Sequence, residues 1–351
     1  MHNHDAIMKL TESEIAALVA QVADDPADVN MLEDTLLPLR FLRNINIDSL
    51  LRDMLTSRDA YMLIPPLFYN ASPDIGKMFL EPLETLPAQK GKKAIKRNLA
   101  QAILATLAWI GGPEMTALFA SWRKEPPAWA KALGMTPISP PLDGGWILKD
   151  AGGHTNLYHD TCYRLIRGAP GADVPIIVNE LADERCQCGS LYSDLLCMNM
   201  DDPRLAFMGR TGVLRVRHCI ACVVSHWGRT FCRVDGLGGC EPFVVGGIDR
   251  DRGWGFADDE LVCPQAYVLD TLPAPITYAG HNTLPVEYMT VGGLPGWIQE
   301  PEYLRCPECG ALMTYFAQME WEKILPLNAE GIVYMQICDN CNIVGLAHQQ
   351  T

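Results

Sequence analysis

Two cysteine pairs near the C-terminus decide the fold of this chain: Arg305-Cys306-Pro307-Glu308-Cys309-Gly310 and, 29 residues after Cys309, Cys338-Asp339-Asn340-Cys341. A Cys-x-x-Cys turn places two thiolates on one metal ion. The glycine after the second cysteine permits the left-handed backbone that closes such a turn. Two turns of this kind, brought together by a strand pair, make a zinc ribbon. We therefore predict a zinc ion held by Cys306, Cys309, Cys338 and Cys341.

An earlier segment repeats this arrangement and predicts an internal duplication. It contains Arg185-Cys186-Gln187-Cys188-Gly189 and, 31 residues after Cys188, Cys219-Ile220-Ala221-Cys222. In both copies a glycine opens a predicted strand seven residues before the second pair, at Gly212 and Gly331. The leading pair of this copy is one residue shorter, which leaves Cys197, His218 and Cys232 as alternative ligands. The predicted second zinc site is Cys186, Cys188, Cys219 and Cys222, and the alternative to a metal is a group of buried reduced thiols.

Both predicted sites are closed. A catalytic zinc keeps three protein ligands and an open position for water, whereas four cysteines fill the tetrahedron. We therefore expect two structural zinc ions, whose coordination energy contributes to folding.

The patterns around the cysteines predict an α+β chain of two domains. Helical periodicity covers residues 12–22, 27–42, 47–55, 93–109 and 114–122, and Thr11 with Glu14 forms a capping box before the first. This predicts a helical domain over residues 1–135, either HEAT-like or an irregular bundle. A Pro/Gly-rich linker follows at 136–145. Residues 146–351 are predicted to form a duplicated, mainly β domain, with copies at about 165–235 and 291–351. Its expected strands include Ile176–Val178, Val213–Val216, Phe243–Val245, Tyr267–Leu269 and Ile332–Met335.

Charge is divided unevenly along the chain. Residues 1–135 carry 14 Lys and Arg against 16 Asp and Glu, whereas residues 136–351 carry 14 against 26. An acidic surface repels phosphate backbones and attracts basic proteins, so the C-terminal domain is expected to bind a basic protein and not nucleic acid. The sequence shows neither a signal peptide nor a membrane-spanning stretch, and it contains an odd number of cysteines, thirteen. These features predict a reducing compartment, the cytoplasm.

Other candidate residues carry weaker signals. His154, His159 and Cys162 lie close in sequence and suggest a third metal site or a Cys/His catalytic pair, although loop histidines are the more common case. Residues 249–260 combine acids with Trp254 and Phe256, as either a solvated loop or a client-binding loop. The remaining candidates have structural interpretations. They are Cys232, Cys240 and Cys263 as buried thiols, and Lys90–Arg97 as a solvated helix start or a nucleic-acid or anion site. Because no catalytic motif stands out, we expect no enzymatic activity. A metal-dependent enzyme that uses His154, His159 or Cys162 is the further alternative.

The second copy also resembles two related families. It contains Gly292-Gly293-Leu294-Pro295-Gly296-Trp297-Ile298-Gln299, then Cys306-x-x-Cys309-Gly310, Tyr315-Phe316-Ala317-Gln318 and a strand leading into Cys338-x-x-Cys341. This order is similar to that of the YwqG-like family of bacteria and the programmed-cell-death-protein-2-like family of eukaryotes. The resemblance implies a duplicated β fold that binds proteins. It favours an immunity protein that neutralises a toxin or, alternatively, a chaperone for a basic ribosomal protein.

Overall fold

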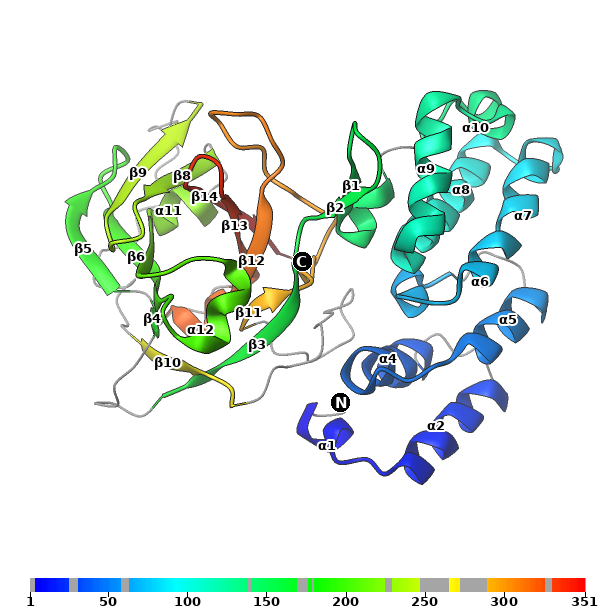
Figure 1. Cartoon of the computed structure of the whole chain (residues 1–351), viewed down its shortest axis with the longest axis horizontal. Helices are drawn as coiled ribbons and strands as arrows, with labels where there is room; N and C mark the ends of the chain where they lie inside the picture. The colour runs from blue at the N-terminus through cyan, green and yellow to red at the C-terminus, as the bar shows by residue number, and fades with distance from the viewer. Residues whose placement is uncertain are drawn as a thin grey trace. The chain divides into compact units, whose positions relative to one another are not determined.

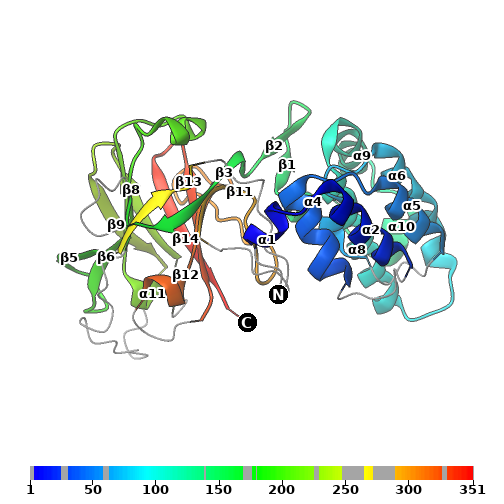
Figure 2. The same cartoon turned by 90° about the horizontal axis from the view of Figure 1, so that it is seen from below.

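The computed structural model describes residues 4–24, 31–57, 63–137, 140–168, 176–178, 180–224, 229–246, 265–271, 289–325 and 330–350. The chain divides into two compact units, one reaching Asn156 and the other beginning at Leu157. The first unit is mainly helical and the second is mainly antiparallel β-sheet (Figures 1 and 2). The predicted α+β fold class is therefore confirmed.

The helices of the first unit follow the predicted apolar periodicity. Thr11 and Glu14 form the predicted capping box, because the Thr11 amide donates to Glu14 Oε2 at 2.8 Å and the Glu14 amide donates to Thr11 Oγ1 at 3.3 Å. The longer helices are α2 (Glu12–Asp24), α4 (Leu37–Arg43) after a π-helical turn at Leu32–Leu36, α5 (Asp48–Ser57), α8 (Lys93–Ile110) and α9 (Gly112–Lys124). Shorter segments are α1 (His4–Met8), η3 (Pro65–Phe68), α6 (Pro73–Met78), α7 (Leu80–Thr85), η4 (Leu86–Ala88), α10 (Ala128–Leu133) and η5 (Pro140–Gly144).

Helix α8 is the centre of this unit. Its Leu99, Ile103, Leu104 and Leu107 are buried, and η3, η5, α6, α9 and α10 all pack against it. The described helices differ in length and do not form a repeated pair, so the unit is better described as an irregular bundle than as a HEAT-like array.

The predicted linker at 136–145 does not mark the boundary between the units. Trp146 lies just after it, is buried, and donates from Nε1 to the Ala108 carbonyl of α8 at 2.9 Å. A small hairpin follows, formed by β1 (Trp146–Leu148) and β2 (His154–Asn156), and it also belongs to the helical unit. The tryptophan therefore anchors the chain to the bundle, and the boundary falls at residues 156–157.

The second unit contains the two predicted copies as matching series of elements. The first comprises β3 (His159–Arg167), β4 (Ile176–Val178), β5 (Glu180–Arg185), β6 (Leu191–Asn199), η6 (Pro203–Met208), β7 (Val213–His218), α11 (Ile220–Val224) and β8 (Arg229–Val234), followed by β9 (Cys240–Val245). The second comprises β10 (Gln265–Leu269), β11 (Thr290–Gly293), β12 (Thr314–Glu320), α12 (Trp321–Ile324), β13 (Ile332–Cys338) and β14 (Ile343–Gln349). Every strand segment predicted above lies within one of these strands.

The order of strands in the sheet supports the duplication. The order is β5-β6-β4-β10-β3-β11-β12-β13-β14-β8-β9, with β7 paired to β6. The second copy's counterparts of β3, β4, β6, β7 and β8 are β10, β11, β12, β13 and β14. When each strand is replaced by its counterpart, the order β7-β6-β4-β10-β3-β11-β12-β13 becomes the same order read backward. Corresponding strands also pair with each other, β3 with β10 and β8 with β14. The copies are thus related by an approximate twofold and begin at β3 and β10, upstream of the predicted 165 and 291.

This arrangement makes the copies depend on each other. The first strand of each copy lies beside the second strand of the other, because β10 pairs with β4 and β3 pairs with β11. One apolar core joins both copies, including Leu196 and Val216 from the first with Met335 and Val344 from the second. Neither copy therefore completes its own sheet or core.

The glycine-rich and glutamine-containing motifs of the second copy have a structural role here. The segment from Gly296 to Leu304 is not a strand, yet buried side chains of the adjacent strands satisfy its backbone. Gln318 accepts from the Gly296 amide, Gln336 accepts from the Leu304 amide, and Tyr334 donates to the Gly296 carbonyl, at 2.6 to 2.8 Å. Buried backbone groups need such partners, so the glutamines replace a missing neighbouring strand.

Candidate metal centres

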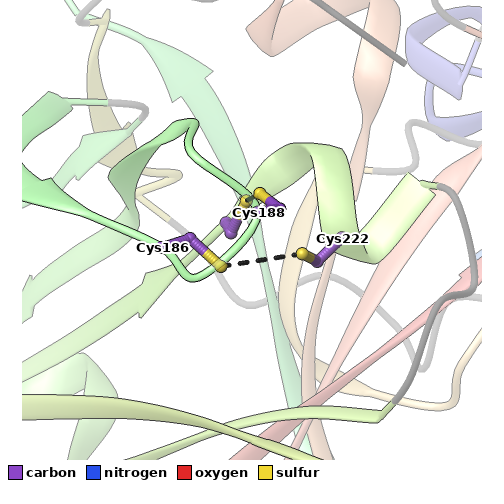
Figure 3. A group of neighbouring side chains, drawn as sticks. Cys186, Cys188 and Cys222 are labelled. Atoms are coloured by element: carbon purple, nitrogen blue, oxygen red, sulfur yellow. Dashed lines mark hydrogen bonds between the residues drawn. The ribbon is translucent and has the colours of Figure 1, made fainter. Parts of the chain in front are cut away.

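The structure brings the first four predicted cysteines together. The Sγ atoms of Cys186, Cys188, Cys219 and Cys222 all lie within 4.8 Å of one another. Cys186 is 3.7 Å from Cys222, and Cys188 is 3.4 Å from Cys219. Figure 3 shows Cys186 and Cys188 on the turn before β6, with Cys222 on α11 facing Cys186.

Local backbone geometry explains the leading turn of this group. The Cys186 amide donates to the Ser190 carbonyl and the Gly189 amide donates to the Cys186 carbonyl, both at 2.9 Å. Gly189 has a φ of 101°, and a Cβ on it would meet nothing within 4 Å. The glycine is therefore required by its backbone conformation and not by lack of space. Arg185 closes the turn by donating to the Gly189 carbonyl at 2.7 Å.

The alternative ligands considered from the sequence lie outside this group. Both Cys186 and Cys188 contribute sulfur atoms, so the shorter spacing of the leading pair excludes neither. Cys197 lies within β6 and Cys232 within β8, where Cys232 is part of the central core. His218 is fully buried, and this burial lowers its pKa to about 3. The four cysteines that converge are therefore the set preferred from the sequence, and none of the alternative ligands replaces one of them.

The second group assembles in the same way. Cys306, Cys309, Cys338 and Cys341 have their Sγ atoms within 4.8 Å of one another, and Cys309 is 3.6 Å from Cys338. The leading turn repeats the first: the Cys306 amide donates to Ala311, Gly310 has a φ of 71°, and Arg305 donates to the Gly310 carbonyl at 3.0 Å. The arginine before each first cysteine was visible in the sequence repeat, but its bond to the glycine carbonyl was not predicted.

The second cysteine pairs differ between the copies. In the first copy Cys222 lies in the short helix α11. In the second copy Cys338 ends β13, Cys341 follows in a turn, and Asn342 adopts a left-handed conformation with a φ of 53° before β14 begins. Asparagine tolerates this conformation better than most residues. The second cysteine pair is thus presented by a helix in the first copy and by a strand end and turn in the second.

The sulfur spacing fits a tetrahedral metal ion. A zinc–sulfur distance of about 2.3 Å places neighbouring tetrahedral sulfurs about 3.8 Å apart, whereas a disulfide would bring them to about 2.0 Å. The closest contacts of 3.4 to 3.7 Å match the first value, and the cysteines of both groups are free thiols. The residues present therefore fit a metal ion in each group.

The thiols of each group strongly affect one another's ionisation. Hydrogen bonds from Cys219 and Cys222 hold the pKa of Cys186 far below the usual thiol value, while their contact with Cys186 raises the pKa of both donors. The Ala311 amide and the Cys338 thiol lower the pKa of Cys309 to about 7, and burial raises that of Cys338 to about 11. Four thiolates at this spacing repel one another, and a divalent cation removes that repulsion.

The two groups have different surroundings. Among the described residues, Cys186, Cys219, Cys222 and Ala221 form a small cluster of their own, against which Cys188 and the ring of Tyr192 pack. The second group belongs to a larger core that includes Phe231, Tyr315 and Tyr334. The exposure of the cysteines differs in the opposite sense from the packing around them. Cys309 of the second group is exposed, whereas the first group has no exposed member.

Two arginines of the first copy reach the second group. Arg210 donates to Asp339, next to Cys338, at 2.9 Å and to Asn342, next to Cys341, at 3.1 Å. Arg233 pairs with Glu308, which lies between Cys306 and Cys309. Four thiolates with one divalent cation carry a net charge of −2, so these guanidinium groups complement the site.

The other candidate residues are not brought into a metal site. His154 Nδ1 lies 2.9 Å from Thr116 Oγ1 in the helical unit. His159 packs against Phe207 with ring centroids 5.2 Å apart, and Cys162 is buried in β3. Among the described residues, the two cysteine groups are the only sets of three or more possible ligands that converge. Cys263 and residues 249–260 lie outside the described residues, and no helix in the described part is long and apolar enough to span a membrane.

Comparison with known proteins gives one relative along almost the whole chain. The chain is similar to the uncharacterized protein YpfL of Salmonella typhimurium (strain LT2), with 26% identity over 358 residues, covering 98% of this chain and 79% of that protein. No protein-family model matches the chain. No solved structure matches it significantly.

Proposed function

We propose that this chain is a non-enzymatic binding protein whose β unit is held by two structural zinc ions and binds a basic protein. The observation that carries the zinc assignment is the assembly of two four-cysteine groups at tetrahedral sulfur spacing. Zinc and iron both accept four thiolates. We choose zinc because closely spaced cysteine pairs are the usual ligand set of structural zinc sites. With either metal, four thiolates leave no position for substrate or water.

Elemental analysis of the purified chain tests this assignment. Two zinc ions per chain are expected, falling to one when Cys219 or Cys338 is replaced by serine. Iron in place of zinc, or no metal in protein purified without chelators, would overturn it. The odd number of cysteines, thirteen, also favours a reducing compartment, and we propose the cytoplasm.

The distribution of charge supports a basic partner. Residues 136–351 carry 26 acidic against 14 basic side chains. Several of these arginines are paired within the unit, Arg164 with Asp270, Arg204 with Asp202, and both Arg215 and Arg217 with Asp194. Acidic side chains such as Asp183, Glu302 and Glu322 remain exposed. The surface therefore favours cations, and its electrostatics would steer a basic protein toward it.

A rigid turn provides an apolar anchor on this acidic unit. Leu237 lies between β8 and β9 and is 87% exposed. The Asp235 carboxylate accepts from the amides of Leu237 and Gly239 at 2.7 and 2.8 Å, and the Gly236 carbonyl accepts from the Val213 amide at 2.8 Å. Asp235 and Glu241 beside it are exposed. An apolar side chain held out by a fixed backbone and flanked by acids suits an interface with a basic protein.

Affinity capture with mass spectrometry tests the partner. We expect a basic protein that binds more weakly as salt rises, and Leu237→Lys should weaken binding at least about tenfold. Val245→Lys, at the other end of β9 and 44% exposed, is the matched control. Equal loss in both variants, or an acidic partner, would contradict the proposed surface.

The identity of the basic partner separates the two specific candidates. We propose an immunity protein whose acidic surface covers the basic cleft of a toxin, and the alternative is a chaperone for a basic ribosomal protein. Co-purification from native cells distinguishes them, because the chaperone would bring down a ribosomal protein. An immunity protein would instead protect cells that express the cognate toxin. Failure of protection would exclude that candidate.

A further inference from the structure

The β8–β9 hairpin contains two cysteines that neither metal centre uses. Cys232 lies in β8 and is fully buried, whereas Cys240 begins β9 and is half-buried. The register pairs Cys232 with Pro242 and Val234 with Cys240, so the two cysteines lie diagonally on the same face of the hairpin. Both pack against the same central core. The thiols are therefore neighbours across two strands.

Their surroundings make the two thiols unequal. Cys240 Sγ accepts the Arg217 amide at 3.3 Å and also interacts with the Cys232 thiol, and these contacts lower its pKa. Burial raises the pKa of Cys232, which keeps that thiol protonated. A partly accessible thiol with a lowered pKa beside a second, buried thiol is the arrangement of a redox pair with an attacking and a resolving cysteine.

We propose that Cys232 and Cys240 form a peroxide-sensitive dithiol that closes to a disulfide. The Cys240 thiolate attacks one peroxide oxygen, the O–O bond breaks, and the released hydroxide takes a proton to become water. Cys240 then carries a sulfenic acid. Cys232 attacks that sulfur, loses its proton, and displaces hydroxide, which leaves as a second water. The two sulfurs lose two electrons in total, and one hydrogen peroxide is reduced to two waters.

The disulfide would act on the surface of the β unit. The hairpin carries both the exposed Leu237 turn and Arg233, which pairs with Glu308 in the second cysteine group. A covalent bridge between its strands would draw the two strands together at the base of that turn. Oxidation therefore has a direct structural route to the surface proposed above, although the chemistry itself does not depend on the partner.

Cys197 provides a matched control in the same unit. It is also half-buried and lies outside both metal groups, but burial raises its pKa, and the nearby carboxylates of Asp194 and Glu180 act in the same direction. Accessibility alone would give Cys197 and Cys240 similar rates. Thiolate character instead predicts oxidation of Cys240 roughly tenfold faster.

The test treats the full, metal-loaded chain with one equivalent of hydrogen peroxide and then alkylates and maps the peptides by mass spectrometry. We expect a Cys232–Cys240 disulfide as the first product, reversed by dithiothreitol and absent in Cys240→Ser. Cys232→Ser should instead accumulate a Cys240 sulfenic acid that dimedone traps. Earlier oxidation of Cys197 or of the metal-group cysteines, or failure of dimedone to label Cys240 in folded Cys232→Ser protein, would overturn the proposal.

Discussion

The two cysteine groups come from the same repeat but depend on their surroundings in opposite ways. The first has no exposed cysteine, yet among the described residues its cluster contains, besides its own thiols, Tyr192 and Ala221. The second exposes Cys309 but is set in an aromatic core with Phe231, Tyr315 and Tyr334. Burial protects a metal from exchange, whereas apolar packing holds the polypeptide without it.

This difference teaches that a duplicated site need not have a duplicated role. At the first site a metal would hold the leading turn in place of a core, so losing it should unfold that turn, whereas α11 keeps Ile220 and Val223 packed in the central core. At the second site the sheet and its aromatic residues would retain the fold after the metal has left. The predictions below are arranged to break or sharpen this distinction.

The largest expected effect follows from removing a ligand of the first site. Cys219→Ser should lower the free energy of unfolding of the β unit by about 4 kcal/mol or more, because a buried coordination site with little other packing is lost. Cys309→Ser should cost about half as much, since its surroundings retain their apolar packing. Urea denaturation followed by circular dichroism measures both. Equal losses of stability in the two variants would show that the packing around a site does not set how much its metal contributes. Cys197→Ser, outside both groups, is the control.

Chelation should separate the sites in time. Zinc should leave the native chain in two phases, because only the second group presents an exposed sulfur to a chelator. The fast phase should be absent in Cys309→Ser, and the fold should change only during the slow phase. A colorimetric zinc indicator and circular dichroism recorded together measure this. A single phase would mean that exposure does not govern release.

The arginines from the first copy should affect only the second site. Arg210→Ala removes a cation beside a site of net charge −2, an effect of about 1 kcal/mol, so zinc should leave the second site roughly fivefold faster. Arg164→Ala is the matched control, because Arg164 pairs with Asp270 and has no part in either group. Faster release from the first site in Arg210→Ala would contradict a local electrostatic effect.

The smallest expected change in stability comes from the N-caps of the short helices that follow β6 and β12. Asp202 caps η6 by accepting from the Arg204 amide at 2.9 Å, whereas Glu320 makes no side-chain cap on α12. Asp202→Ala should therefore lower stability by about 1 kcal/mol and Glu320→Ala by less than about half of that. Thermal unfolding of the two variants measures the difference.

Asp202 should also make the stability of the chain depend on pH in a predictable direction. Hydrogen bonds from Arg204 hold the pKa of Asp202 below its usual value. A carboxylate with a lowered pKa contributes stability above its unfolded value of about 3.9 and loses it as pH falls through the folded value. The stability difference between the native chain and Asp202→Asn should therefore be full at neutral pH and vanish in acid. A difference that persists below the folded pKa would contradict this account.

The sequence predicted those features that follow from local spacing. The eight cysteines, the glycines at 189 and 310, the capping box at Thr11 and the strand segments all lie where the structure has them. Each depends on residues within one turn or one strand. The repeat of cysteine pairs also led directly to the duplication, because matching spacing implies matching local structure.

Long-range contacts explain what the sequence did not predict. In the sheet, the first strand of each copy, β3 or β10, lies beside the second strand of the other copy. This arrangement depends on strand pairing between residues about a hundred positions apart, which local patterns do not encode. The boundary was placed too early because Trp146, after a Pro/Gly-rich stretch, bonds to Ala108 of α8. Arg210 and Arg233 had no local signal, since their partners Asp339 and Glu308 belong to the other copy.

Zinc K-edge X-ray absorption of the purified chain tests the central claim most directly. Two closed four-cysteine sites predict a first shell of four sulfurs at about 2.3 Å on every zinc, without nitrogen or oxygen ligands. A first shell with one or more light atoms per zinc would mean an open or mixed site. That result would contradict the assignment of these metals as purely structural.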